Sequence, residues 1–361
     1  MGFKCGIVGL PNVGKSTLFN ALTESAIAAE NFPFCTIEPN IGIVNVPDDR
    51  LERIHKISQS ERLIYASTTF VDIAGLVKGA SHGEGLGNAF LANIREVNAI
   101  AHVVRCFENE NITHVNGKIN PLDDLEVILT ELALADIQTL NNREEKNKKL
   151  IKSNDVLIKK ETQIIERIIE EISDTNHINL SLYSDEDNEI ISTFNLLTSK
   201  PFFVVGNISE DENLNHQTEI HQWCDKNSIQ FIPVVVKQEY EIATLDQEER
   251  KEYLNLLGLS EPALNSIIRA GFEILGLQTY FTSGPKESRA WTIKKGSLAP
   301  QAAGVIHTDF EKGFIKAEVV SYDHFIEYSG NHGARQEGAL RLEGKDYIVK
   351  DGDVILFKFN V

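Results

Sequence analysis

A run of nine residues near the N-terminus has the residue types and the spacing of a phosphate-binding loop. Gly9–Thr17 reads GLPNVGKST, which satisfies the Walker A pattern, and it lies between an apolar run and a helical run. In such a loop the backbone N–H groups surround phosphate oxygens at the N-terminus of a helix. We therefore expect a nucleoside triphosphate to be bound by Asn12, Val13, Gly14, Lys15, Ser16 and Thr17.

The same pattern predicts a magnesium site. Lys15 supplies a positive charge to the β- and γ-phosphate oxygens, and the Ser16 hydroxyl ligates Mg²⁺. Asp72 and Gly75 form a DxxG arrangement, in which the carboxylate holds the metal through water and the Gly75 N–H meets the γ-phosphate. Thr36 is the candidate switch threonine that adds a second hydroxyl to the metal, although it could also be an ordinary loop residue.

The segment that reads the base departs from the guanine-binding pattern. A guanine-specific protein carries Asn-Lys-x-Asp here, whereas this chain has Asn207-Ile208-Ser209-Glu210. The longer Glu210 misplaces the acceptor for guanine, and Ile208 removes the stem and charge of the lysine. Asn207 and backbone groups are then available to adenine, with Ile208 as an apolar cover. The segment favours ATP over GTP.

The elements that position these residues form an α/β fold. Apolar β-branched runs alternate with helical segments, which predicts a mostly parallel sheet covered by helices. The expected strands of this sheet are 3–8, 69–72, 101–107, 202–206 and 231–236.

Two further regions differ from this alternation. Residues 122–199 carry apolar positions at helical spacing, interrupted by turn-forming residues at 153–155, which predicts an insertion of two antiparallel helical arms; ordinary helices packed on the sheet are the alternative. Residues 278–361 contain glycine-punctuated runs, with strands expected at 290–293, 314–320, 346–349 and 354–359. We therefore expect a nucleotide-binding domain over 1–277 and a small β-rich domain over 278–361.

The composition limits the partners of the protein. A formal net charge of −18 over 361 residues argues against general electrostatic binding to nucleic acid or to an anionic membrane. The four cysteines are far apart in the sequence, and we expect neither a zinc site nor a disulfide framework. No signal peptide and no apolar span of bilayer length is apparent, so we expect a cytoplasmic protein without membrane contact.

Taken in order, these motifs resemble the Obg-related YchF (Obg-like ATPase) family over essentially the whole chain. The resemblance is carried by the Walker A loop, the run Gly83–Asn88 (GEGLGN), the helical insertion and the C-terminal strands. It implies a P-loop G-domain fold, a coiled-coil insertion and a C-terminal TGS domain with a β-grasp core. It also supports the preference for ATP.

The residue that positions the attacking water is not evident from the DxxG motif. Ras-like enzymes use a glutamine directly after its glycine, but Leu76 stands here. The resemblance points to His114 as the catalytic histidine, because an imidazole could orient or deprotonate water; a loop-capping role is the alternative, and His82 is the rival candidate. Asn12 is of the residue type that ligates K⁺ in related potassium-stimulated enzymes, so potassium dependence is a further, open expectation.

The main functional hypothesis is a ribosome-associated ATPase whose slow hydrolysis of ATP resets a switch in translation or stress regulation. The basic and aromatic residues of 278–361 could serve an RNA surface, but solvated charges on an ordinary β-domain explain them equally well. The resemblance favours contact with the ribosome, by its large subunit, or with rRNA, and the chain is expected to be a monomer. A translational GTPase and a binding module with ATP as a structural ligand are the alternatives. Nothing indicates the second substrate pocket of a small-molecule kinase.

Overall fold

The chain forms two compact units, which are described separately. The computed structural model describes residues 3–29, 40–74, 86–109, 118–150, 156–211 and 216–360. The first unit comprises Phe3–Gly42 with Thr69–Leu264, and the second comprises Ile43–Thr68 with Asn265–Val361. The segment 43–68, which the sequence groups with the nucleotide-binding domain, thus belongs to the C-terminal unit.

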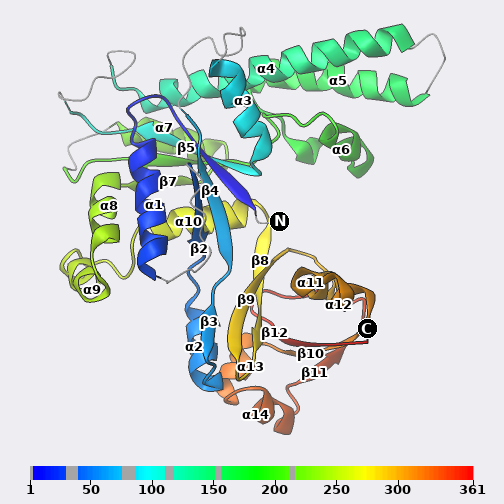
Figure 1. Ribbon diagram of the computed structural model, residues 1–361. Helices are drawn as coiled ribbons and strands as arrows, with labels where there is room; N and C mark the ends of the chain where they lie inside the picture. Colours follow the sequence, from blue (N-terminus) through cyan, green and yellow to red (C-terminus); the bar gives the residue numbers. More distant parts are fainter. Residues whose placement is uncertain are drawn as a thin grey trace. The chain divides into compact units, whose positions relative to one another are not determined.

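The first unit is built on a six-stranded sheet in the order β2-β4-β1-β5-β6-β7 (Figure 1). The pairs β4–β1, β1–β5, β5–β6 and β6–β7 are all parallel. Its strands are β1 (Lys4–Val8), β2 (Ile41–Asn45), β4 (Ser67–Asp72), β5 (Ala99–Arg105), β6 (Phe202–Asn207) and β7 (Phe231–Val234). The central strands β5 and β6 are buried along their whole length, as expected for a parallel sheet covered on both faces.

Helices surround this sheet, and they confirm the predicted α/β class. They are α1 (Lys15–Ala29), α3 (Leu86–Glu96), α4 (Pro121–Leu150), α5 (Val156–Thr175), the 3₁₀ turn η3 (Leu180–Leu182), α6 (Asp185–Ser192), α7 (Gln217–Lys226), α8 (Val236–Thr244) and α9 (Gln247–Leu256). Helix α10 (Leu264–Ile274) belongs, apart from its first residue, to the second unit. None of the described helices combines the length and the apolar composition that crossing a membrane requires.

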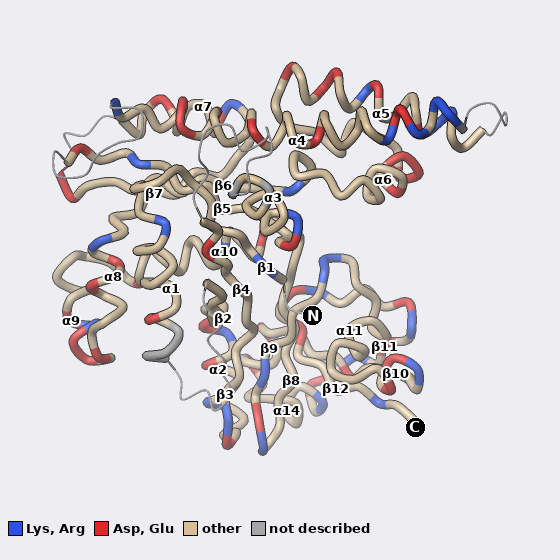
Figure 2. The backbone as a smooth tube through the Cα atoms, turned by 45° about the horizontal axis from the view of Figure 1, so that its top comes forward, with Lys and Arg blue, Asp and Glu red and all other residues tan. Residues whose placement is uncertain are grey.

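The predicted helical insertion is present as α4 and α5, which lie side by side and extend beyond the sheet (Figure 1). One face of α5 is buried because isoleucines recur at helical spacing, with Ile164, Ile168 and Ile172 packed against Leu140 of α4. Acidic and basic residues recur along both helices (Figure 2). The predicted break at 153–155 lies outside the described residues.

Asp136 in α4 anchors this insertion to the chain that leads into β6. Its fully buried carboxylate accepts hydrogen bonds from the backbone N–H groups of Leu197 and Thr198, at 3.1 and 2.8 Å, and from the Thr198 hydroxyl at 2.8 Å. Three donors offset part of the cost of burying a carboxylate. The start of β6 is thereby fixed relative to α4.

The second unit contains a second six-stranded sheet in the order β11-β10-β12-β8-β9-β3. Its elements are α2 (Asp49–Ser58), β3 (Arg62–Ile64), β8 (Leu277–Ser283), β9 (Glu287–Lys294), α11 (Ala299–Ile306), α12 (Thr308–Lys312), β10 (Phe314–Val320), α13 (Tyr322–Glu327), α14 (Asn331–Gln336), β11 (Arg341–Glu343) and β12 (Val354–Phe359). The expected strand 346–349 is absent, since Ile348 forms only an isolated bridge to Leu298.

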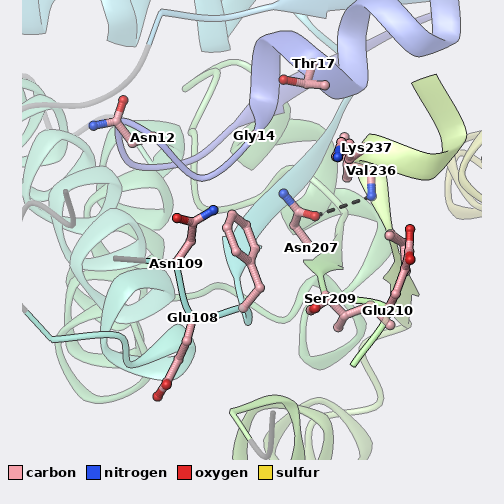
Figure 3. Close-up of a pocket in the computed structure, with 13 residues that line it drawn as sticks. Asn12, Gly14, Thr17, Glu108, Asn109, Asn207, Ser209, Glu210, Val236 and Lys237 are labelled. Atoms are coloured by element: carbon pink, nitrogen blue, oxygen red, sulfur yellow. Dashed lines mark hydrogen bonds between the residues drawn. The ribbon is translucent and has the colours of Figure 1, made fainter. Parts of the chain in front are cut away.

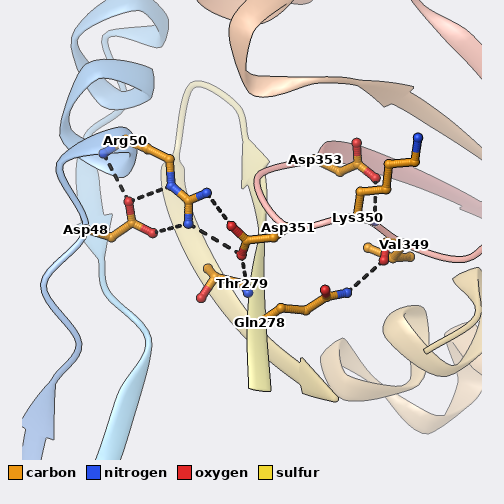
Figure 4. Close-up of polar contacts among 8 residues, drawn as sticks. All are labelled: Asp48, Arg50, Gln278, Thr279, Val349, Lys350, Asp351 and Asp353. Atoms are coloured by element: carbon orange, nitrogen blue, oxygen red, sulfur yellow. Dashed lines mark hydrogen bonds and ion pairs between the residues drawn. The ribbon is translucent and has the colours of Figure 1, made fainter. Parts of the chain in front are cut away.

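Residues 43–68 join this unit through a β-strand and an arginine. Strand β3 pairs in parallel with β9, so that a three-residue strand from early in the chain ends the sheet. The Arg50 guanidinium donates to Asp48 at 2.8–2.9 Å and to Asp351 at 2.6 Å (Figure 4). Asp351 in turn accepts from the Thr279 N–H at 2.9 Å. Both carboxylates raise the pKa of Arg50, so its charge is retained.

A buried histidine lies in the middle of the first sheet. His102 of β5 is fully buried, and neither ring nitrogen has a hydrogen-bond partner among the described residues. Its ring meets Phe202 edge-on, with the centroids 5.1 Å apart. Burial lowers the pKa of His102 to about 3 from its ordinary 6.5, because the charged imidazolium cannot be solvated there.

This depressed pKa predicts a pH-dependent loss of stability. As pH falls below about 6.5, the unfolded chain binds a proton at His102 that the folded chain refuses, so unfolding becomes easier down to about pH 3. We expect wild type to lose about 1.5–2 kcal/mol more than His102→Leu between pH 6.5 and 5, measured by urea unfolding. His324→Leu, at an exposed histidine, is the control and should follow wild type. Equal slopes for wild type and His102→Leu would contradict the assignment.

Candidate nucleotide-binding site

Five loops meet at one edge of the first sheet. Because the paired strands from β4 to β7 are parallel, their carboxyl ends share an edge, which is where ligands bind in open α/β sheets. The Walker A loop follows β1, Asp72 ends β4, residues 106–109 follow β5, residues 208–211 follow β6, and Val235 links β7 to α8. The topology therefore gathers the predicted phosphate-binding and base-reading segments into one site.

The Walker A loop has glycines where backbone or side chains approach closely. A Cβ on Gly9 would lie 2.4 Å from the Val103 carbonyl oxygen. Gly14 has φ +102°, and a Cβ there would lie 2.3 Å from the Asn207 amide nitrogen. Larger residues are thus excluded at both positions. Helix α1 begins directly afterwards at Lys15, so its first N–H groups face the loop.

Lys15 and Asp72 form the charged part of the loop. The Lys15 ammonium is buried and donates to the Leu10 carbonyl at 2.7 Å. Burial lowers the pKa of Lys15, and the nearby negative charge of Asp72 opposes that shift. The Ser16 hydroxyl donates to Asp72 Oδ2 at 3.0 Å. The structure thus brings together the lysine, the serine and the aspartate that the two motifs predict.

These residues fit a magnesium ion. Asp72 Oδ1 is buried and has no hydrogen-bond partner among the described residues, while Oδ2 contacts the Ser16 hydroxyl. A carboxylate and a hydroxyl are ligands suited to Mg²⁺, which keeps several waters or phosphate oxygens in its shell. In the described ranges, no three His, Cys, Asp or Glu side chains gather to hold a metal alone. Thr36, Gly75 and His114, together with Leu76 and His82, lie outside the described residues.

Asn207 connects the Walker A loop to the far side of the site. Its amide nitrogen donates to the Val13 carbonyl at 2.9 Å. Its amide oxygen accepts from the Val236 N–H at 3.4 Å (Figure 3). The side chain is 6% exposed. Both polar ends of the amide are therefore used by the backbone, which makes Asn207 a positioning residue for the loop and for α8.

A pocket of about 680 Å³ opens beside this amide (Figure 3). Predicted residues that line it are Asn12, Gly14, Thr17, Asn207, Ile208 and Glu210. Other lining residues, which the sequence reasoning missed, are Phe107, Glu108, Asn109, Ser209, Val235, Val236 and Lys237. A mixture of apolar side chains and a few polar groups in a cavity of this size suits a small organic ligand.

The aromatic wall of the pocket is fixed by a buried arginine. Arg105, at the end of β5, is 1% exposed and donates to the carbonyls of Phe107 at 3.0 Å and Asn109 at 3.1 Å. Its guanidinium carbon lies 4.6 Å from the centre of the Phe107 ring. Burial lowers the pKa of Arg105, and the Asp124 carboxylate opposes that shift. The sequence did contain a signal for this loop, because Arg105 is a charged residue at the end of a largely apolar strand.

Helix α8 forms the opposite wall, and a buried carboxylate holds it. Glu239 is 2% exposed and accepts from the N–H groups of Ala263 at 3.0 Å and Leu264 at 3.2 Å. The helix begins at Val236, although the sequence predicts a strand through that residue. At the rim, the Glu108 carboxylate lies 2.8 Å from His216 Nε2.

Replacing Asn207 by alanine should weaken nucleotide binding. The change removes the donor to Val13 and the acceptor for Val236, leaving two backbone groups without these partners. We expect the dissociation constant for a fluorescent ATP analogue with Mg²⁺ to rise about 10- to 100-fold. Asn255→Ala, on the exposed face of α9, is the matched control. Unchanged affinity in a folded Asn207→Ala protein would show that nucleotide binding does not need the two hydrogen bonds of the Asn207 amide.

Two family models match the chain. The model of the YchF-GTPase_C family, described as a protein of unknown function, matches residues 277–360. The model described as a 50S ribosome-binding GTPase matches residues 4–142. The two matches cover both the Walker A region and the C-terminal strands.

Relatives match the chain from end to end. It is 54% identical over 363 residues to the Ribosome-binding ATPase YchF of Escherichia coli O157:H7, and 47% identical over 366 residues to that of Bacillus subtilis, with 100% of each chain covered. The solved structure of the Schizosaccharomyces pombe YchF GTPase is 38% identical, covers 99% of this chain and 98% of its own, and has a TM-score of 0.89. Full-length identity at this level confirms the resemblance seen in the motifs, and the chain belongs to the YchF family.

Proposed function

We propose that the protein is a Mg²⁺-dependent P-loop ATPase that binds the ribosome and acts as a nucleotide-dependent switch in translation or stress regulation. Relatives that match its whole length are named ribosome-binding ATPases. The observation that carries the proposal is the pocket beside the Walker A loop, in which Ile208 and Glu210 stand where a guanine-specific protein has lysine and aspartate.

The pocket supports adenine as the base. Asn207 is occupied by the Val13 and Val236 backbones, so discrimination falls to the residues that follow it and to free backbone groups. Ile208 offers an apolar surface from one side, and Phe107 offers an aromatic ring. Guanine would lose the aspartate that pairs with its N1–H and N2 amine. The names of the relatives differ on this point, since the fission yeast protein is called a GTPase.

The phosphate end of the site would carry out hydrolysis. Ser16 and Asp72 would hold Mg²⁺, with Thr36 as a further ligand, and the charge on the β- and γ-phosphates would be neutralised there. Lys15 donates to the phosphate oxygens, and the Gly75 N–H contacts the γ-phosphate in this proposal. His114 orients the water that attacks. A K⁺ ion near Asn12 is also part of the proposal, because asparagine is the residue type that ligates K⁺ in related potassium-stimulated enzymes and Asn12 lines the pocket.

The partner and the location follow from the family. The names of the relatives and of one family model include ribosome or 50S binding, which supports the large subunit or its rRNA as the partner. We assign the nucleotide-binding role to the part of 1–277 that forms the first unit and a TGS role to 278–361. The protein is proposed to act as a cytoplasmic monomer.

Restoring the guanine-binding residues should shift the base preference. Wild type is expected to bind ATP more tightly than GTP with Mg²⁺, in titrations with fluorescent analogues. Ile208→Lys with Glu210→Asp should lower the ratio of the GTP to the ATP dissociation constant by about 10-fold, because a paired carboxylate contributes strongly to base discrimination. Ile208→Leu with Glu210→Gln supplies neither group and should not lower the ratio. Tighter GTP binding by wild type would make the protein a GTPase.

Ribosome binding should depend on the nucleotide. We expect co-sedimentation with ribosomes to differ between a non-hydrolysable ATP analogue and ADP, and ribosomes to accelerate ATP hydrolysis. Lys15→Ala, which removes the charge from the phosphate site, should abolish the difference between the two nucleotides. Equal binding by wild type in both states would instead favour a binding module in which ATP is a structural ligand.

A further inference from the structure

Helix α3 has one end next to the DxxG motif in the sequence and the other end against α4. It is the first described element after Asp72, and its first residue, Leu86, lies within the run Gly83–Asn88. Residues that follow a DxxG motif change position when the γ-phosphate is lost. An 11-residue helix is a stiff rod of about 16 Å, so a shift at one end reaches the other. Helix α3 can therefore carry the nucleotide state away from the phosphate site.

Lys200, on the chain that leads into β6, holds the C-terminal end of α3. Its ammonium donates to the Arg95 carbonyl at 3.2 Å and to the Val97 carbonyl at 2.6 Å. Carbonyls at the end of a helix lack partners within the helix and carry the negative end of its dipole, so a cation is favourable there. Burial lowers the pKa of Lys200, the Asp136 carboxylate opposes that shift, and the charge of Arg95 adds to it. Because Asp136 of α4 accepts from Thr198, one short segment before β6 contacts both α3 and α4.

Arg95, in the last turn of α3, contacts α4 directly. Its guanidinium donates to the Thr139 hydroxyl at 3.4 Å, and this hydroxyl donates to the Ala135 carbonyl of its own helix at 2.9 Å. Asp136 lies three positions before Thr139, on the same side of α4. Its carboxylate interacts electrostatically with both Arg95 and Lys200. We call Arg95, Asp136, Thr139 and Lys200 the α3–α4 joint.

The contacts between α4 and α5 are tighter than the contact between α3 and α4. Isoleucines of α5 pack against Leu140 in an apolar core, and Glu161 of α5 accepts from Arg143 at 2.7 Å. Helices α4 and α5 should therefore move as one body, which extends beyond the sheet (Figure 1). The Arg95–Thr139 hydrogen bond, at 3.4 Å, is longer than the usual range of about 2.7–3.2 Å. A long polar contact can be exchanged between two arrangements more easily than an interdigitated apolar one.

We propose that the α3–α4 joint passes the nucleotide state from the ATP site to the insertion formed by α4 and α5. The nucleotide sets the position of α3, and Arg95 and Lys200 set the position of α4 relative to the end of α3. Both act as positioning residues, since no residue of the joint lines the nucleotide pocket. Coupling between two sites is reciprocal, so a partner that holds the insertion also changes the affinity for nucleotide. The inference rests on the proposed nucleotide-dependent switch and names the part of the chain that responds to it.

Hydrogen–deuterium exchange of the full chain tests the joint. The protein is given Mg²⁺ and either a non-hydrolysable ATP analogue or ADP, and exchange is measured in peptides from α3, α4 and α5. In wild type we expect the rates in all three helices to differ about 5-fold or more between the two nucleotides, which is the lower end of typical coupling between sites. Arg95→Gln should keep the difference in α3 but reduce the difference in α4 and α5 to below about 2-fold. Its affinity for a fluorescent ATP analogue should stay within about 3-fold of wild type.

Glu96→Gln is the matched control, because it changes the charge of an exposed neighbouring residue of α3 by the same amount. It should behave as wild type, and an equal loss in α4 and α5 would overturn the proposal. Thr139→Val removes the hydroxyl that accepts from Arg95 at almost constant size, so it decides the question if Arg95→Gln does not fold. The difference in α4 and α5 should shrink in this variant, and a full wild-type difference would contradict the joint.

The result for wild type separates the inference from the proposed function. Equal exchange with both nucleotides in α3, α4 and α5 would refute the proposed switch and the joint with it. A difference in α3 without one in α4 and α5, or the reverse, would refute the joint alone. The same holds for a difference in α4 and α5 that survives Arg95→Gln.

Discussion

The amide of Asn207 is the interaction on which the geometry of the nucleotide site depends. It joins the Val13 carbonyl in the Walker A loop to the Val236 N–H at the start of α8, so one side chain sets the spacing between the phosphate end and the base end. The same amide explains why residue 14 is glycine, since a Cβ would collide with it. The departure from the guanine-binding motif therefore begins after Asn207, at Ile208 and Glu210, which do not join the Walker A loop to α8.

Buried charged side chains fix other backbone segments around the Asn207 amide. Arg105 holds the loop after β5, Glu239 holds α8, and Asp136 holds the chain entering β6, each by donating to or accepting from backbone groups. An unpaired buried charge is very costly, whereas one that satisfies several backbone partners fixes a loop in a single arrangement. The pocket walls are thus positioned by side chains that do not belong to any nucleotide-binding motif.

The sequence predicted the parts of the fold that depend on local pattern. The Walker A loop, β5, β6 and the helical insertion have strong apolar periodicity, and the structure contains them. The attachment of residues 43–68 was not predictable, because β3 has three residues and pairs with β9 more than 220 positions away. The run of valines at 234–236 favoured a strand by propensity, but α8 begins at Val236, whose N–H is bonded to Asn207. Phe107 was missed because a single aromatic residue after a strand has no distinctive spacing.

Charge is unevenly distributed over this acidic chain. An acidic chain is repelled by a polyanion at long range, and the repulsion weakens within about 10 Å at moderate salt, where local charges dominate. Neighbouring lysines repel each other, and this repulsion is a cost that the rest of the sheet must offset. Lys316 and Lys358 have this arrangement on a sheet whose other face supplies the core. The hydrophobic core on that other face offsets the repulsion between the exposed lysines, so folding stability and surface charge are carried by opposite sides of the same strands.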